Sequence, residues 1–307
     1  MNTRKMVIGA VLVIIGLPVV LVLIAAVSIY FLNRTNGTIV SSGEKRDYLL
    51  YVPRSYDRAK PTPLVISMHG KTLWPAAQME ISQWNRVAEE HGFIVVYPSG
   101  TMKAMLFRTW RIRPEADLRA DVRFISELID TLEAAYNIDP TRIYANGISN
   151  GARMTVALSC ALSHRIAAVG TVAAPQVLSW SWCADSPPVP MIAFHGTADP
   201  GLPYNGGRSW GALFPSVLTW TADWARRNRC GPNPVESAVA ADVTRLEYTN
   251  CADDAAVVLY TVHGGGHTWP GGKPLPVPEW MAGPTSRSID ASSQMWAFFR
   301  EHPLPRK

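Results

Sequence analysis

The sequence predicts an α/β fold, with a mostly parallel central sheet and helices on both of its faces. Short apolar runs alternate with longer amphipathic stretches from residue 47 onward, and strands that alternate with crossover helices pair in parallel. The strand segments are mostly continuous apolar runs, as buried parallel strands require. With 307 residues, of which 48% are hydrophobic, the chain can bury a large core, which excludes a mainly disordered protein.

The predicted elements follow one another along the whole body of the chain. We expect strands at residues 47–53, 63–69, 93–97, 142–148, 166–172, 189–194 and 257–262. We expect helices at residues 82–91, 117–136, 150–162, 216–229 and 290–301. In sheets of this kind, ligands bind outside the carboxyl ends of the strands, so the residues that follow each strand are the candidates for a site.

The first 32 residues differ from the body. Residues 6–32 carry no charge and follow Arg4 and Lys5. As a helix this segment would be ~40 Å long, enough to cross a hydrocarbon core of roughly 30 Å. Basic residues before such a helix favour a cytoplasmic N-terminus. We predict an uncleaved membrane anchor at 1–32, a short polar linker at 33–44 and one globular domain at 45–307 outside the cytoplasm. A cleaved signal peptide, which would release a secreted protein, is the alternative.

The four cysteines and the charge fit that location. None of the cysteines lies in a C-x-x-C, which argues against zinc ribbons and thioredoxin-like redox chemistry. In an oxidising compartment they can form disulfides, and we predict the pairs Cys160–Cys183 and Cys230–Cys251 because each closes a short loop; four buried thiols are the alternative. The net charge of +5 comes without a dense basic run, so we expect no nucleic-acid partner.

A strand-to-helix turn with a serine at its centre gives the strongest indication of a site. Residues 147–151 read Gly-Ile-Ser-Asn-Gly, the G-x-S-x-G pattern, and lie between a predicted strand and a predicted helix. Such a turn lifts the serine oxygen clear of the backbone, and Gly147 and Gly151 let strand and helix approach closely. The helix N-terminus offers amide groups to an oxyanion. We therefore predict Ser149 as a nucleophile rather than as part of an ordinary turn.

A serine hydroxyl needs a neighbouring base, and in this architecture the acid and the base follow the serine in the chain order Ser, Asp/Glu, His. Asp199 follows the strand at 189–194, and His267 lies in a glycine-rich loop after the strand at 257–262. We predict Asp199 as the acid and His267 as the base. We interpret the other histidines close to strand ends as scaffold or hydrogen-bonded neighbours: His69, His195 and His263.

An oxyanion hole requires two donors where negative charge develops. We assign one to the backbone amide of Asn150, which follows the nucleophile. The second should come from the loop after the strand at 63–69, and we assign it to the amide of Lys71, with Thr72 as the alternative.

These motifs resemble the extracellular polyhydroxybutyrate depolymerase and feruloyl esterase-like family of α/β-hydrolases. The resemblance covers roughly residues 45–303 and is carried by His69-Gly70 and residues 92–98, 138–140, 149–151, 195–199 and 264–272. It implies the α/β-hydrolase fold, and the roles of nucleophile, acid and base for Ser149, Asp199 and His267. The chain departs from the family pattern at Lys71, where a Cys or a small residue is usual.

Tryptophans are frequent in the loops that we place at the carboxyl edge: Trp74, Trp110, Trp180, Trp182, Trp210 and Trp269. Aromatic walls suit phenolic esters, sugars or polyester chains, but a single tryptophan is more often part of core or rim packing. We predict substrate contact only for Trp269, because it lies two residues beyond the predicted base.

Together these features predict a serine esterase that acts on extracytoplasmic esters, such as polyhydroxyalkanoate, feruloyl or related carbohydrate esters, through an acyl-enzyme. We expect no cofactor or metal, because the sequence has no H-E-x-x-H, P-loop or dinucleotide-binding motif. The alternatives are a peptidase or acyltransferase on the same fold, and a catalytically idle, membrane-tethered binding module.

Overall fold

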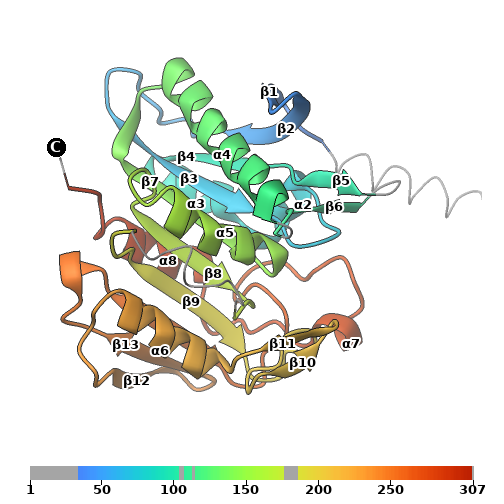
Figure 1. Ribbon diagram of the computed structural model, residues 1–307, viewed down its shortest axis with the longest axis vertical. Coiled ribbons are helices and arrows are strands. Elements are labelled where there is room, and N and C mark those ends of the chain that lie inside the picture. Colours follow the sequence, from blue (N-terminus) through green and yellow to red (C-terminus); the bar gives the residue numbers. More distant parts are fainter. Residues whose placement is uncertain (1–33, 104–106, 113–114, 176–185, 306–307) are drawn as a thin grey trace, which may run out of the picture.

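The structure is a computed structural model that describes residues 34–103, 107–112, 115–175 and 186–305. Its centre is a ten-stranded sheet with the order β1-β2-β4-β3-β7-β8-β9-β14-β13-β12 (Figure 1). The six inner strands pair in parallel. They are β3 (Thr62–Met68), β4 (Ile94–Pro98), β7 (Ile138–Ile148), β8 (Ala168–Val172), β9 (Met191–Gly196) and β14 (Val257–Val262). The mostly parallel sheet expected from the apolar runs is confirmed.

Helices cover both faces of this sheet, as the alternation of strands and helices predicted. On one face α4 (Glu115–Ala135), α5 (Asn150–Ala161) and α6 (Val217–Arg227) bury a cluster that includes Phe124, Met154 and Trp220. On the other face α2 (Pro75–Ser82), α3 (Trp84–His91) and α8 (Ala291–Phe299) bury a second cluster that includes Trp84 and Phe299. The sheet is thus buried on both sides, which explains why its central strands have no polar face.

Antiparallel strands extend the sheet at both edges. At one edge β2 (Glu44–Tyr51) pairs with β4, and β1 (Gly37–Ser41) pairs with β2. At the other edge β13 (Val243–Tyr248) and β12 (Val235–Ala240) follow β14. Residues 37–41 therefore belong to the sheet, which corrects the prediction of a linker over 33–44. β1 alternates exposed and partly buried side chains and so, as an edge strand, lacks the continuous apolar run that marks the inner strands.

Short elements surround the carboxyl ends of the parallel strands. The hairpin β5–β6 (Thr101–Lys103 and Phe107–Thr109) follows β4, and the hairpin β10–β11 (Gly207–Ser209 and Ala212–Phe214) follows β9. The short helix α7 (Glu279–Ala282) lies beyond β14. Figure 1 shows β10, β11 and α7 on the same side of the molecule.

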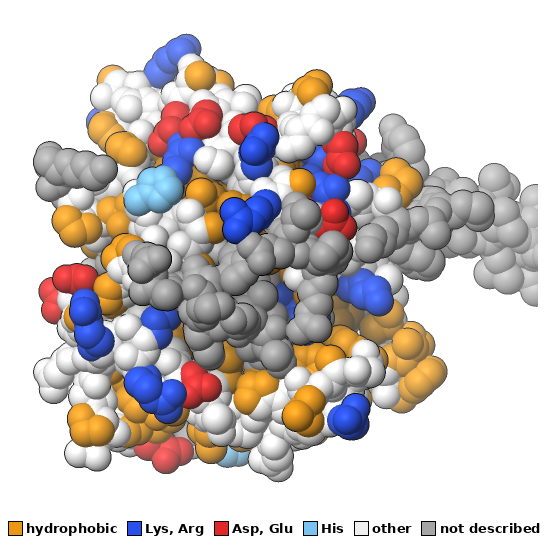
Figure 2. Space-filling model, in the orientation of Figure 1, with side chains coloured by type: hydrophobic (Ala, Val, Ile, Leu, Met, Phe, Trp, Pro, Cys, Tyr) orange, Lys and Arg blue, Asp and Glu red, His pale blue; other side chains and the backbone are white. Residues whose placement is uncertain are grey.

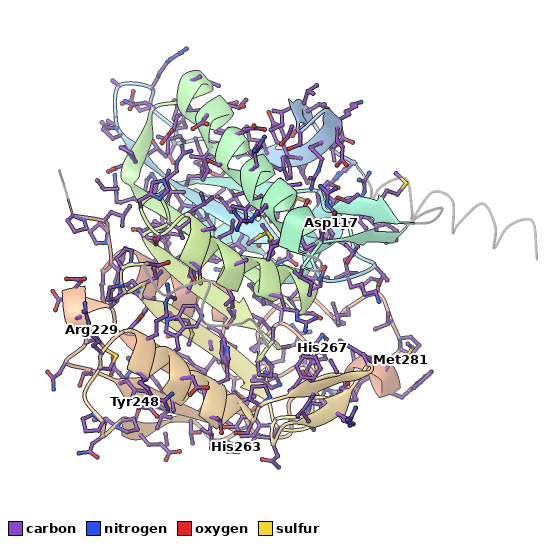
Figure 3. All side chains as sticks on the ribbon, viewed as in Figure 1. Asp117, Arg229, Tyr248, His263, His267 and Met281 are labelled. Carbon is purple, nitrogen blue, oxygen red and sulfur yellow. A yellow bond between two sulfur atoms is a disulfide. The ribbon has the colours of Figure 1, made fainter. Side chains whose placement is uncertain are left out.

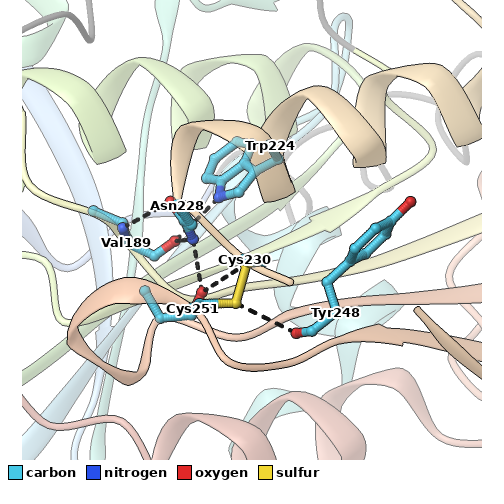
Figure 4. Close-up of a disulfide and its surroundings, with 7 residues drawn as sticks. Val189, Trp224, Asn228, Cys230, Tyr248 and Cys251 are labelled. Atoms are coloured by element: carbon cyan, nitrogen blue, oxygen red, sulfur yellow. Dashed lines mark hydrogen bonds between the residues drawn. A yellow bond between two sulfur atoms is a disulfide. The ribbon is translucent and has the colours of Figure 1, made fainter. Parts of the chain in front are cut away.

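A disulfide between Cys230 and Cys251 joins the chain after α6 to the chain after β13 (Figure 4), which confirms this predicted pair. Beside it the Asn228 amide donates hydrogen bonds to the carbonyls of Val189 and Ala255, both at 2.8 Å. Cys160 is also disulfide-bonded, whereas Cys183, its predicted partner, lies outside the described residues.

The predicted anchor at 1–32 also lies outside the described residues, which begin at Arg34. Within the part of the chain that the structure describes, no helix combines the length and the apolar character that crossing a bilayer requires.

Candidate active site

Ser149 lies in a sharp turn between β7 and α5, where the G-x-S-x-G pattern predicted it. Its backbone angles are φ 54° and ψ −117°, in a region that non-glycine residues rarely adopt. The Ser149 amide donates a 2.9 Å hydrogen bond to the Val172 carbonyl on the neighbouring strand β8, which holds the turn. Strain of this kind persists only where the surroundings enforce it, and it is concentrated at functional sites.

The two glycines of the pattern allow the turn to form. A Cβ atom on Gly147 would lie 2.6 Å from the backbone carbon of Gly151. A Cβ atom on Gly151 would lie 2.3 Å from the Met68 carbonyl oxygen at the end of β3. Because these contacts involve backbone atoms, any larger side chain would force β3, β7 and α5 apart.

Asp199 and His267 come together from two different loops. The Asp199 Oδ2 atom accepts a 2.8 Å hydrogen bond from His267 Nδ1, and Oδ1 accepts two more, both 2.8 Å, from the amides of Gly201 and Leu202. Burial alone would raise the pKa of the Asp199 carboxyl, but these hydrogen bonds and the neighbouring histidines hold it below its ordinary value. Asp199 is therefore an ionised, fixed acceptor that orients one imidazole.

A second histidine lies on the other side of the same carboxylate. The His195 ring is buried, and its Nε2 atom lies 2.8 Å from the Leu202 carbonyl oxygen and 3.4 Å from Asp199 Oδ2. Burial lowers the pKa of His195, so it is neutral and donates from Nε2. This arrangement agrees with the scaffold role that its position before Asp199 suggested.

Two backbone amides near Ser149 have no hydrogen-bond partner among the described residues. Within the described part of the chain, neither the Lys71 amide nor the Asn150 amide donates a hydrogen bond. The Thr72 amide, the alternative considered from the sequence, donates to the Arg108 carbonyl at 2.9 Å and is occupied. The Asn150 side chain adds a contact that sequence reasoning missed, because its Oδ1 atom accepts a 2.7 Å hydrogen bond from the Trp110 amide and so ties the turn to the chain after β6.

His69 fixes the direction of the Lys71 amide. His69 Nδ1 lies 2.7 Å from the Gly70 carbonyl oxygen, and its Nε2 atom accepts a 3.0 Å hydrogen bond from the Gly100 amide. The Gly70 carbonyl and the Lys71 N–H belong to one planar trans peptide and point in opposite directions. The Lys71 N–H therefore points away from His69, and Lys71 is one of the residues that line the cavity beside Ser149.

The buried His69 should make the fold sensitive to acid. Burial lowers the pKa of His69 to about 4 from an ordinary value of 6.5. As the pH falls through this interval the unfolded chain takes up a proton that the folded chain refuses, so the free energy of unfolding should fall by about 2 to 3 kcal/mol between pH 7 and pH 4.5. Urea unfolding at the two pH values measures this loss.

The variant His69→Gln isolates this contribution, because glutamine offers similar hydrogen-bonding groups and does not titrate. We expect its loss between pH 7 and pH 4.5 to be smaller than that of the wild type by about 2 kcal/mol. His263→Gln is the matched control, because His263 is exposed. Equal losses in His69→Gln and in the wild type would contradict this assignment.

Ser149 and His267 line one small cavity of about 80 Å³ together with Gly70, Lys71, Leu73 and Leu275. The Ser149 hydroxyl makes no hydrogen bond to another described residue, His267 included. A larger cavity of about 1040 Å³ lies among Asp139, His164, Pro187 and the C-terminal residues, and contains none of the predicted site residues. The smaller cavity is therefore the candidate active site. Among the described residues, no cluster of His, Cys, Asp and Glu side chains could hold a metal ion.

Trp269 does not line this cavity, so the structure gives no support to its predicted substrate contact. The side chain is 1% exposed, packs in the core cluster that α3 and α8 cover and donates a 3.1 Å hydrogen bond to Ser292. Trp110 is also buried, and Trp180 and Trp182 lie outside the described residues. Trp210 instead lies beside His267, with ring centroids 6.0 Å apart.

Comparisons with known proteins show which proteins this chain resembles. The chain matches the family model of esterase PHB depolymerases over residues 46–184. It is 30% identical over 286 residues to NocK of Nocardia uniformis subsp. tsuyamanensis, a protein assigned as an esterase, and the match covers 84% of this chain and 80% of NocK. Feruloyl esterase B of Piromyces equi is 30% identical over 237 residues, 74% of this chain but only 44% of that protein.

Among solved structures, the acetyl xylan esterase from Aspergillus awamori superposes with a TM-score of 0.56 at 20% identity, over 76% of this chain and 93% of that one. A likeness at that identity establishes the α/β-hydrolase fold. The match to NocK extends over most of both proteins and the family model covers the strands and the turn around Ser149, and so the chain belongs to the esterase PHB depolymerase family of serine esterases.

Proposed function

We propose that this protein hydrolyses carboxylic esters with Ser149 as nucleophile, His267 as general base and Asp199 as the orienting acid. The observation that carries the proposal is the 2.8 Å hydrogen bond from His267 Nδ1 to Asp199 at a cavity that Ser149 also lines. Asp199 keeps the proton of the imidazole on Nδ1, which leaves Nε2 free to accept the proton of the serine hydroxyl.

In the first half of the reaction, Ser149 Oγ attacks the ester carbonyl carbon while its proton passes to His267 Nε2. The carbonyl oxygen becomes an oxyanion, which the free amides of Lys71 and Asn150 are available to bind. One such donor contributes roughly 3 kcal/mol to the stability of the transition state. Collapse of the tetrahedral intermediate breaks the bond to the alcohol oxygen, which leaves with the proton from His267.

In the second half, water attacks the acyl-enzyme and gives a proton to the same imidazole nitrogen. The second tetrahedral intermediate collapses, the carboxylic acid leaves and Ser149 regains its proton from His267. The cavity is open between the His69–Thr72 loop and the Leu275–Val277 loop. Water can therefore reach the acyl-enzyme, and no other residue is needed to deliver it.

The substrates that we propose are esters of extracytoplasmic polymers. Relatives are named feruloyl esterase B, a bifunctional acetylxylan esterase/xylanase and a poly(3-hydroxyalkanoate) depolymerase, which supports feruloyl, acetyl or hydroxyalkanoate esters. An extracytoplasmic location is supported by the Cys230–Cys251 disulfide, because such bonds persist in oxidising compartments. We further propose that residues 6–32 anchor the protein in the membrane, since they form one uncharged apolar segment.

A fluorophosphonate probe tests the assignment of the nucleophile, because it reacts with a serine only when a base activates it. We expect the full-length protein to be labelled at one site, and peptide mapping to place the label on Ser149. Ser237, an exposed serine on β12, should remain unlabelled in the same digest. Labelling at another serine, or an absence of labelling in a folded protein that hydrolyses esters, would refute the proposed mechanism.

A further inference from the structure

Trp210 occupies a turn position that does not suit a tryptophan. In the β10–β11 hairpin Ser209 pairs with Ala212, so the loop consists only of Trp210 and Gly211, with φ 46° and φ 76°. A two-residue loop with two positive φ angles is a type I′ turn, which favours Asn-Gly. A left-handed backbone is unfavourable for any residue with a Cβ atom, and more so for a bulky one. Turn propensity therefore does not account for a tryptophan here.

Burial does not account for it either. The Trp210 side chain is 68% exposed, whereas most of the tryptophans that the structure describes lie in the core. Its ring stands edge-to-face against His267, with an interplanar angle of 80°, and a Cβ atom added to Gly201 would lie 3.0 Å from Trp210 Cζ2. The Gly201 amide in turn binds Asp199. An exposed ring on a strained backbone thus lies directly against the Asp199–His267 pair.

The size of the cavity requires a binding surface outside it. The cavity measures about 80 Å³, whereas sites that enclose a small-molecule ligand typically measure about 300–1,000 Å³. An ester larger than a few atoms must therefore extend over the surrounding surface. Figure 2 shows hydrophobic side chains gathered over the β10–β11 hairpin and α7, and Figure 3 shows His267 and Met281 on this side of the molecule.

We propose that Trp210 is the platform on which a ring of the alcohol part of the substrate lies. The proposal rests on the proposed function, in which His267 gives its proton to the departing alcohol oxygen. That oxygen must come within about 3 Å of the imidazole, so the group attached to it lies next to the ring that touches His267. An exposed tryptophan face binds flat rings, either an aryl ring or the C–H face of a sugar. Trp210 would thus select esters of ring-bearing alcohols.

Three acetates with different alcohols test this role in the full-length protein: 4-nitrophenyl acetate, an acetylated xylopyranoside and ethyl acetate. All three substrates share the acetyl group. Because the wild type and the variant are compared on the same substrate, differences in intrinsic reactivity among the three esters cancel in the ratio of the two kcat/KM values. We expect Trp210→Ala to lower kcat/KM by about 10-fold or more on at least one ring-bearing acetate, mainly through KM. On ethyl acetate we expect a change below about threefold. The ring-bearing acetate that suffers the larger loss identifies the ring.

Equal losses on all three acetates would mean that Trp210 only holds the imidazole, and no loss would mean that it has no role; either result overturns the proposal. Val40→Ala is the control and should leave all three activities unchanged, because Val40 is an exposed apolar side chain on the edge strand β1 and does not line the cavity. Ser149→Ala tests the proposed function separately: if that variant remains active on every acetate, the mechanism fails whatever the result for Trp210.

A second variant separates a substrate platform from a structural tryptophan. Trp210→Asn creates the Asn-Gly pair that a type I′ turn favours, so we expect Tm to rise by about 1–3 °C while the selective loss on ring-bearing acetates persists. A lower Tm in Trp210→Asn would show that the fold needs this ring, and would overturn the interpretation of Trp210 as a residue kept for substrate binding.

Discussion

Ser149→Ala is expected to lower kcat for ester hydrolysis by roughly 10⁵- to 10⁶-fold, because a serine nucleophile and its base act as one unit. Steady-state kinetics on 4-nitrophenyl acetate measure the loss. KM should change little, since the Lys71 and Asn150 amides and the walls of the cavity are retained. The residual rate then reports the contribution of binding and of the oxyanion hole alone.

The fold of this variant should be intact, which makes the loss interpretable. The hydrogen bond that holds Ser149 in its turn comes from its backbone amide to the Val172 carbonyl, and its hydroxyl makes no hydrogen bond to a described residue. The free energy of unfolding should therefore change by less than about 1 kcal/mol. Ser237→Ala, at the exposed far edge of the sheet, is the matched control and should keep full activity. Activity of Ser149→Ala within tenfold of the wild type would exclude Ser149 as the nucleophile.

The central sheet could be predicted from the sequence because its strands are apolar on both faces. Thr62–Met68 and Val257–Val262 are buried along their whole length, and only continuous apolar runs meet that condition. The edge strands gave no such pattern. Five of the six residues of Val235–Ala240 are exposed, so nothing in that segment distinguishes a strand from a loop. Pairing with β13, which is decided by tertiary structure, makes it a strand.

The residues of the candidate site also divide into those that a sequence rule locates and those that depend on tertiary structure. Ser149, Asp199 and His267 could be placed because the positions after parallel strands converge at one sheet edge, and the Asp199–His267 hydrogen bond agrees with that placement. The tryptophans could not be sorted this way. Trp269 was predicted to contact substrate because it lies two residues beyond His267, yet its side chain is buried in the core. Trp210 lies in a turn whose usual sequence signal, Asn-Gly, is absent, so its place beside His267 depends on a strained backbone that sequence rules do not anticipate.

Asp199→Asn is expected to lower kcat by roughly 10⁴-fold while the fold survives. The orientation of the new amide is fixed, because the Gly201 and Leu202 amides donate to the Oδ1 position and therefore retain the oxygen there. The NH₂ group must then take the place of Oδ2 and point at His267 Nδ1. It donates to that nitrogen and so drives the imidazole proton to Nε2, the atom that has to accept the serine proton.

His195 adds a weaker, opposing contact. Its Nε2 atom already donates to the Leu202 carbonyl and lies 3.4 Å from Oδ2, so an NH₂ group at Oδ2 faces a second donor there. The two 2.8 Å hydrogen bonds from the Gly201 and Leu202 amides at Oδ1 outweigh this longer contact and keep the amide in that orientation. Asp139→Asn is the matched control. Asp139 is a buried carboxylate that accepts hydrogen bonds from Thr141 and Arg142 and does not line the cavity that contains Ser149. It should lose stability but keep kcat within about twofold. Measuring kcat beside urea unfolding for both variants separates the two effects. A loss of kcat in Asp199→Asn no larger than in Asp139→Asn would mean that the imidazole does not depend on Asp199 for its tautomer.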